Sequence, residues 1–287
     1  MRTINVWFAC FWGGFNYYDN FFVDMLRLAG FNVVVDGSNP DVVFYSVFGP
    51  APLNYGCKRI FFTGENSGPP NFNECHYALT SYFMDDEPRH FRIPLYTIYC
   101  REYIKAGFFT GYDEFTKPRK SIDEVMSTKT NFCNFIYTRC CEPRNSFMQQ
   151  LCQYKKVDSG GGCLNNIGGK VGDKNAFIRN YKFTIAFENG SDYAGLIGYT
   201  TEKLFEPMMC NTLPIYWGNQ HIHKDFNTNT FINYHDFNSF DDLINHIIKV
   251  DNDDNLYYNY LKESYVLSYE NSYFNVNKIS DYFKQIL

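Results

Sequence analysis

Apolar segments recur along the chain with two alternating spacings, one typical of strands and the other typical of helices. In the first part of the chain, short β-branched or aromatic runs bounded by Gly, Pro, Asn and Asp predict strands. A run with helical spacing predicts a helix that ends at Ala29 and Gly30. The predicted strands are 4–9, 31–35, 41–48 and 60–63, and the predicted helix is 21–28. Strands separated by helices indicate a mainly parallel sheet that is covered on both faces.

This alternation is interrupted near the middle of the chain and then starts again. Residues 117–121 are polar and contain a proline, which predicts a linker between two domains, 1–120 and 121–287. Beyond the linker, the predicted strands are 131–138, 157–162 (which runs into a glycine loop), 183–187 and 214–217, and the predicted helices are 143–154, 202–209 and 240–250. The prediction is therefore an α/β protein whose two domains face a cleft. Open α/β sheets bind ligands beyond the carboxyl ends of their strands, so functional residues are expected there.

The composition is that of a globular protein and argues against a nucleic-acid partner. The chain has 287 residues, of which 45% are hydrophobic, and this length is enough for two domains of ordinary size. The formal net charge is -5, and no run of five or six like charges occurs. Nucleic-acid binding would normally require a basic excess or stripe, so no nucleic-acid partner is expected.

The ten cysteines are expected to be reduced, buried thiols and not disulfides. The chain opens directly on a strand-like segment, without the basic and then apolar pattern of a signal peptide. No apolar run approaches the ~18 residues that a membrane span needs. We therefore expect a cytoplasmic protein without stable membrane insertion, in which thiols stay reduced. The cysteines form no CxxC pair, so no metal site is predicted from them.

The first candidate site follows the predicted strand 183–187. A glycine-containing loop leads from this strand to a helix that begins near Thr201, and helix N-termini favour phosphate. Lys203 in the first helical turn would add a full positive charge, and Glu202 could accept hydrogen bonds from ribose hydroxyls. Taken alone, Thr-Glu-Lys is more often a capped helix with solvated charges.

Two further candidates lie at other predicted strand ends. Arg144 stands at the start of a predicted helix, and a guanidinium can grip a diphosphate in bidentate fashion. Glu65 follows the strand 60–63 and could act as a general base from the cleft. Inversion at a sugar carbon needs such a carboxylate opposite the leaving group, by analogy with inverting hydrolysis. Each residue considered alone is more often a solvated surface charge.

Several motifs in one order resemble the α-1,3-fucosyltransferases, glycosyltransferase family ten, in their bacterial form. The likeness runs from about Phe44 to Phe237. The motifs are Thr63-Gly-Glu-Asn66, Arg92-Ile-Pro-Leu-Tyr96, Asp158-Ser-Gly-Gly-Gly162 with Leu164-Asn-Asn-Ile-Gly168, Phe187-Glu-Asn189, Gly198-Tyr-Thr-Thr-Glu-Lys203, Pro214-Ile-Tyr-Trp-Gly218, Lys224-Asp-Phe-Asn227 and Phe231-Ile-Asn-Tyr-His-Asp-Phe237.

The resemblance implies a GT-B architecture of two Rossmann-like domains, the first binding the acceptor and the second GDP-fucose. It implies transfer of fucose with inversion, often to O3 of N-acetylglucosamine in N-acetyllactosamine-like glycans. It places Glu65 at the catalytic base, Arg144 and Lys203 at the diphosphate and Glu202 at the ribose. The remaining implied donor-site residues are Asn189, Tyr199, Tyr137 and Thr138.

Three alternatives stay open. The chain could use another nucleotide sugar or make an α-1,4 bond, or it could be a catalytically silent protein that binds a nucleotide sugar or a glycan. An intact Glu65 argues against silence, since a binding protein needs no base there. The acidic stretches 85–87 and 251–254 are interpreted as solvated. No metal and no cofactor other than the donor substrate is expected, because Arg144, Lys203 and a helix N-terminus could serve the leaving diphosphate.

Overall fold

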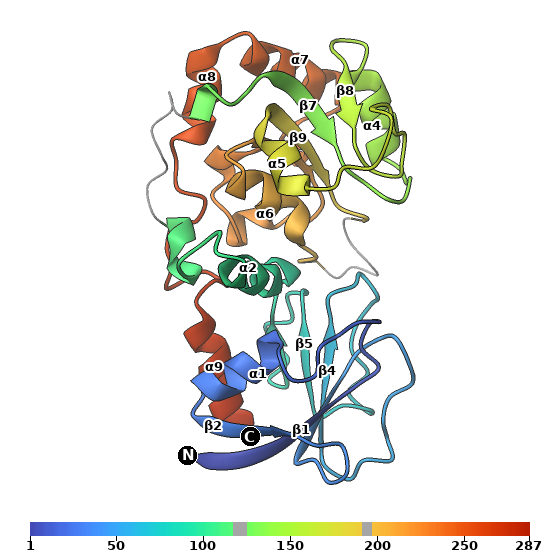
Figure 1. Ribbon diagram of the computed structural model, residues 1–287, viewed down its shortest axis with the longest axis vertical. Coiled ribbons are helices and arrows are strands. Elements are labelled where there is room, and N and C mark those ends of the chain that lie inside the picture. The colour runs from blue at the N-terminus through green and yellow to red at the C-terminus, as the bar shows by residue number, and fades with distance from the viewer. Residues whose placement is uncertain (117–124, 191–196) are drawn as a thin grey trace. The chain divides into compact units, whose positions relative to one another are not determined.

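The computed structural model describes residues 1–116, 125–190 and 197–287. The chain divides into two compact units, each with its own parallel sheet (Figure 1). Unit 1 comprises Met1–Glu114, Asp192–Tyr199 and Tyr269–Leu287, and unit 2 comprises Phe115–Ser191 and Thr200–Ser268. The predicted linker, 117–121, and with it the predicted boundary at 120, lies outside the described residues.

Unit 1 is built on a six-stranded sheet in the order β2-β1-β3-β4-β5-β6. All neighbouring strands in it are parallel. The strands are β1 (Arg2–Ala9), β2 (Phe31–Val35), β3 (Val42–Tyr45), β4 (Lys58–Thr63), β5 (Tyr77–Thr80) and β6 (His90–Arg92), and the helices are α1 (Phe21–Leu28), α2 (Leu95–Lys105) and α9 (Val276–Ile286). The side chain of Asn20 accepts a hydrogen bond from the Val23 amide and so begins α1. Gly30, at a φ of 92°, ends it.

The C-terminal helix returns to unit 1, which the sequence did not predict. Helix α9 joins the same hydrophobic core as α1 and the central strands. The ring of Phe283 meets the ring of Phe44 edge-on at 5.8 Å, and Arg2 donates to the carbonyl of Leu287 at 2.9 Å, so the two chain ends lie together beside β1 and β2 (Figure 1). The predicted second domain, 121–287, is therefore wrong at its C-terminal end. The apolar stripe of α9 finds its partner in the first sheet.

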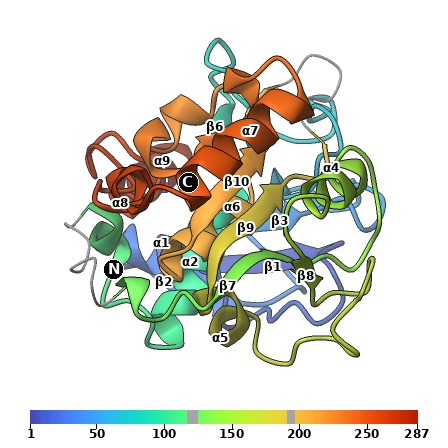
Figure 2. The ribbon, with the colours of Figure 1, turned by 90° about the horizontal axis from the view of Figure 1, so that it is seen from above.

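Unit 2 is built on a five-stranded parallel sheet in the order β11-β10-β9-β7-β8. The strands are β7 (Asn131–Phe135), β8 (Val157–Ser159), β9 (Tyr181–Phe187), β10 (Leu213–Trp217) and β11 (Ile232–Asn233), and the helices are α4 (Arg144–Leu151), α5 (Lys174–Arg179), α6 (Glu202–Met209), α7 (Phe240–Asp251) and α8 (Asp254–Leu261). Figure 2 shows β7, β9 and β10 running side by side in one direction. Their carboxyl ends therefore meet at one edge of the sheet. Short 3-10 helices lie at Tyr112–Thr116, Ile222–Lys224, Thr228–Thr230 and Tyr234–Asp236.

The predicted elements are confirmed in type, and several are shorter than expected. The strand expected at 131–138 stops at Phe135, and the helix expected at 143–154 spans Arg144–Leu151. Elements β5, β6, β11, α2, α5, α8 and α9 were not predicted. In the described part of the chain, no helix has both the length and the apolar character needed to cross a bilayer.

The expectation of reduced thiols is wrong for one pair of cysteines. Cys140 and Cys163 form a disulfide with Cα atoms 5.1 Å apart. Their sequence separation is 23, and only the packing of the two loops beyond β7 and β8 brings them together. The other eight cysteines are free, as expected, but four of them are only partly buried, namely Cys10, Cys57, Cys141 and Cys152.

Candidate functional site

A buried carboxylate organises the start of helix α6. Glu188 follows β9 directly, and its side chain is fully buried. Its carboxylate accepts hydrogen bonds from the Thr201 amide at 2.7 Å and from the Thr201 hydroxyl at 2.8 Å. The Thr201 hydroxyl in turn accepts from the Lys203 amide at 3.4 Å as the N-cap of α6. Glu188 therefore fixes the position from which Lys203 extends.

Positive and negative charges lie close together at this helix start. The Lys203 ammonium is 3.5 Å from the Glu188 carboxylate and 3.3 Å from the Glu202 carboxylate. Burial raises the pKa of Glu188 above its usual range, although the Lys203 charge acts against this. Burial would also raise the pKa of Glu202, but the charges of Lys203 and Lys174 outweigh it and the pKa is lowered. Glu202 is therefore held ionised beside Lys203 and can accept hydrogen bonds.

Arg144 is held rigidly at the first turn of α4. It is 2% exposed, and its guanidinium donates to the Asn189 side chain at 2.7 Å and to the carbonyl of Arg139. The same guanidinium lies over the ring of Tyr137, 4.0 Å from the centroid. Its Nε is buried and has no hydrogen-bond partner among the described residues. A buried cationic donor left without a partner is costly, so this group points to a ligand that accepts from it.

Tyr137 lies just beyond β7, and its hydroxyl is hydrogen-bonded to the backbone of β9. Its hydroxyl lies 2.9 Å from the carbonyls of Ile185 and Phe187 and accepts from the Phe187 amide at 2.8 Å. Burial raises the pKa of Tyr137, so the phenol stays neutral. The hydroxyl is therefore hydrogen-bonded to β9, and Tyr137 contacts the site through its ring, which lies under Arg144. Thr138, the next residue, is exposed.

The glycine loop beyond β8 packs on these residues. A Cβ on Gly161 would lie 2.1 Å from the Tyr137 carbonyl oxygen, and one on Gly162 would lie 3.0 Å from that of Thr138. The Cys163 amide donates to the Tyr137 carbonyl at 2.8 Å. Side chains are thus excluded where the two loops meet, which explains the run of glycines.

Glu65 lies in unit 1, just beyond β4, with an exposed side chain. Its amide donates to the Thr63 hydroxyl at 3.0 Å, so the turn after the strand is held in place. A Cβ on Gly64 would lie 2.7 Å from Leu95, which explains the glycine that precedes Glu65. The residue lines a cavity of about 460 Å³ within this unit. Tyr199, predicted with the donor residues, also belongs to unit 1.

Six of the eight predicted site residues therefore lie in unit 2, around the carboxyl ends of its central strands. These are Tyr137, Thr138, Arg144, Asn189, Glu202 and Lys203. Glu188 lies within one of the motifs, but no role was predicted for it. Lys174, which pairs with Glu206 on α6, was not predicted. A carboxylate directly after a buried strand was the available signal for Glu188. Lys174 carried none, because only the packing of α5 on α6 brings it near.

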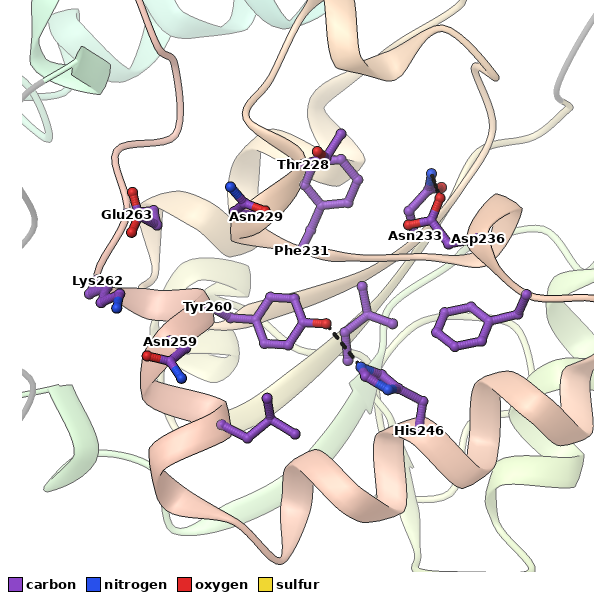
Figure 3. A pocket seen from close by; sticks show the side chains of 13 residues that line it. Thr228, Asn229, Phe231, Asn233, Asp236, His246, Asn259, Tyr260, Lys262 and Glu263 are labelled. Atoms are coloured by element: carbon purple, nitrogen blue, oxygen red, sulfur yellow. Dashed lines mark hydrogen bonds between the residues drawn. The ribbon is translucent and has the colours of Figure 1, made fainter.

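Unit 2 also contains a hollow, which does not coincide with the predicted site residues at the strand ends. It has a volume of about 560 Å³ and lies beside β11, α7 and α8, with His246 and Tyr260 joined by a 2.9 Å hydrogen bond (Figure 3). None of the predicted site residues lines it. Among the described residues, no group of three or more His, Cys, Asp or Glu side chains could hold a metal ion.

Comparisons with known proteins show the family to which the chain belongs. Residues 6–99 match the α-(1,3)-fucosyltransferase FucT N-terminal domain, and residues 126–282 match glycosyltransferase family 10 (fucosyltransferase), C-terminal part. The α-(1,3)-fucosyltransferase FucT of Helicobacter pylori is 34% identical over 86% of this chain and 57% of its own length. The human GDP-fucose protein O-fucosyltransferase 3 is 29% identical over 69% of this chain and 43% of its own. The chain thus spans about half the length of these curated relatives.

Solved structures agree on the architecture. An α1,3-fucosyltransferase crystallised with GDP-fucose has a TM-score of 0.78 and 29% identity, covering 100% of this chain and 91% of that one. The Anabaena protein Alr3699/HepE, solved with UDP and glucose, has a TM-score of 0.58 at 8% identity over 99% of this chain and 100% of its own, a likeness of fold alone. The predicted GT-B fold of two Rossmann-like domains is confirmed.

Proposed function

The chain belongs to glycosyltransferase family 10, the fucosyltransferases, and from this premise we propose that it transfers L-fucose from GDP-fucose to a glycan. The proposed acceptor is O3 of N-acetylglucosamine in an N-acetyllactosamine-like or other GlcNAc-containing glycan, and transfer inverts the anomeric centre. The products are the fucosylated glycan and GDP.

The observation that carries this proposal is the pair of cations at the strand ends of unit 2. Arg144 has a buried Nε without a partner among the described residues, and Lys203 extends from the start of α6. Both groups are held in place by other side chains before any ligand arrives. Fixed cations and a helix N-terminus stabilise a departing diphosphate without reorganisation. In this proposal Glu202 accepts from the ribose hydroxyls.

Four further residues complete the proposed donor site. Asn189 holds Arg144 through its side-chain oxygen, and in this proposal its amide group donates to the donor substrate. Tyr137 contributes its ring beneath Arg144, and Thr138 presents an exposed side chain at the end of the same loop. Tyr199 is assigned to the donor by the resemblance alone.

Glu65 is the proposed catalytic base. Its carboxylate takes the proton of the acceptor hydroxyl, while that oxygen forms a bond to the anomeric carbon of fucose. The bond from the same carbon to the GDP oxygen breaks, and its electron pair leaves with GDP. Base catalysis of this kind contributes roughly 10²–10⁴-fold, or about 3–5 kcal/mol of barrier.

The test is GDP release from GDP-fucose in the presence of EDTA, with N-acetyllactosamine, lactose and chitobiose as acceptors. Glu65→Gln should lower acceptor-dependent turnover at least about a hundredfold and leave GDP affinity unchanged, since Gln keeps the shape but not the basicity. Asp86→Asn is the matched control, because it removes an exposed carboxylate from the same unit and should change neither quantity.

The outcomes separate this proposal from its alternatives. GDP binding without turnover on any acceptor would favour a catalytically silent binding protein. A fucosylated product with an α-1,4 bond, identified by NMR, would change the linkage but not the mechanism. Failure to bind GDP at all would remove the basis for the assignment.

A further inference from the structure

The cavity beside Glu65 is shaped by elements of unit 1 alone. The loop between β1 and α1 and the first turns of α2 contribute most of its wall. Its volume of about 460 Å³ falls within the roughly 300–1,000 Å³ usual for small-molecule sites. Gly14, at a φ of 83°, turns the β1–α1 loop at the rim. The cavity therefore has a built wall around the proposed base.

Three partly exposed aromatic side chains line this cavity. Trp12 is 39% exposed, Phe48 52% and Tyr99 36%. The ring of Trp12 is held by Phe15, which also lines the cavity and meets it edge-on with centroids 5.0 Å apart. Exposed aromatic rings gathered at one hollow mark a binding surface more often than they occur by chance. Rings fixed in advance lose little entropy when they stack on a ligand.

The charges that line the cavity are all negative. Among the described residues around it, the charged side chains are Asp19, Glu65 and Glu102. Asp19 and Glu102 are anchored by the buried Arg101, and Asp19 also by Lys105. Hydrogen bonds from Lys105 and then Arg101 lower the pKa of Asp19 to about 2. The carboxylate of Glu65 makes no hydrogen bond or ion pair within the described chain, so it is available to a ligand.

We propose that this cavity is the acceptor subsite and that it selects an uncharged saccharide, with Trp12 and Tyr99 as stacking walls and Glu102 as a hydroxyl-binding carboxylate. This inference rests on the proposed function. The apolar face of a pyranose ring packs on an aromatic face, while its hydroxyls need acceptors such as carboxylates. A sugar that carries a carboxylate or sulfate would meet the Glu65 carboxylate and two ion-paired carboxylates, with no cationic side chain among the described residues that line the cavity, which costs affinity. Trp12, Tyr99 and Glu102 are thus specificity-determining residues.

The experiment measures saccharide binding directly and turnover separately. Saturation-transfer NMR gives the affinities of N-acetyllactosamine, lactose and chitobiose, and of a uronic-acid analogue of the best of them, in the presence of GDP. Trp12→Ala and Tyr99→Ala should each weaken binding of the neutral saccharide about 10- to 100-fold, while the Kd for GDP stays within twofold. Trp12→Phe should restore most of the affinity. Tyr18→Ala is the matched control, since Tyr18 is a 67% exposed aromatic on the same loop and does not line the cavity.

The binding measurements either support or overturn the proposed acceptor subsite. Weaker binding in both alanine variants, with Tyr18→Ala unchanged and the uronic-acid analogue bound at least about tenfold less tightly, supports it. Neutral binding that survives both alanine substitutions overturns it, as does equal binding of the charged analogue. Absence of saccharide binding by wild type that still binds GDP also overturns it. Failure of the proposed function is distinguishable, because it would appear as absent GDP binding or absent turnover whatever Trp12 and Tyr99 do.

Discussion

Replacing Arg144 by lysine keeps the positive charge of the proposed diphosphate site but changes the geometry of its hydrogen-bond donors. The substitution therefore tests the geometry apart from the charge. The guanidinium uses one nitrogen for Asn189, one for the Arg139 carbonyl, and stacks on Tyr137. Its Nε is left for the ligand. A lysine keeps the positive charge but has a single nitrogen and no planar fork. The three N–H donors of Arg144→Lys share one nitrogen, so the ammonium cannot reproduce contacts that the guanidinium spreads over three nitrogens.

The expected loss follows from the contacts. Hydrogen bonds to charged groups contribute about 1.5–3 kcal/mol each. Loss of one such bond to the diphosphate corresponds to a rise in the Kd for GDP of roughly 10- to 150-fold. The substitution also leaves a buried acceptor without its partner, which costs about 1–3 kcal/mol of folding free energy. Arg144→Ala should weaken GDP binding further, because the charge is removed as well.

Isothermal titration calorimetry with GDP measures the effect, and thermal unfolding without ligand checks that the variant is folded. Arg179→Lys is the control, since it makes the same chemical change at an exposed arginine of the same unit. It should leave the Kd unchanged. An Arg144→Lys variant that binds GDP as tightly as wild type would refute the role given to the guanidinium fork.

Three further predictions concern the loops and the pH dependence of stability. Gly161→Ala should lower the free energy of unfolding by about 1–3 kcal/mol and weaken GDP binding, because its Cβ would lie 2.1 Å from a backbone oxygen; Gly169→Ala, which meets open space, should match wild type in denaturant unfolding and calorimetry. Reduction of Cys140–Cys163 should lower the free energy of unfolding by about 3 kcal/mol, since the bond closes a loop with a separation of 23 residues, and unchanged urea unfolding under a phosphine reductant would contradict this. Burial lowers the pKa of His90 from 6.5 to about 4. The unfolded chain therefore takes up a proton below pH 6.5 before the folded chain does, and the free energy of unfolding should fall by up to about 3 kcal/mol between pH 6.5 and 4; His90→Gln should flatten that slope in pH-dependent urea unfolding.

The fold was largely readable from the chain because its central strands carry continuous apolar runs. Such runs are typical of parallel strands buried on both faces, and they were placed correctly in both units. Most of the elements that were missed are short, although helices α2 and α9 were also missed and have 11 residues each. Strand β6 has three residues and β11 two, and helix α5 has one fully buried side chain. Short elements such as these depend on neighbours far away in the sequence.

The sequence by itself determined the alternation of strands and helices in both halves of the chain, the family and the group of polar residues that follow the strands. These features are local, because a strand end, a helix cap and a glycine loop each depend on a few adjacent residues. Parallel strands bring their carboxyl ends to one edge of the sheet, so the sequence alone predicts that Asn189 and Lys203 lie in one site.

The tertiary structure decided what holds those residues in place. Only packing shows that Glu188 is buried beneath Thr201, that Arg144 lies on the ring of Tyr137, and that α9 completes the core of unit 1. The Cys140–Cys163 bond depends on contacts of the same kind. Contacts between distant segments arise from the fit of whole surfaces, and no short stretch of sequence contains that information.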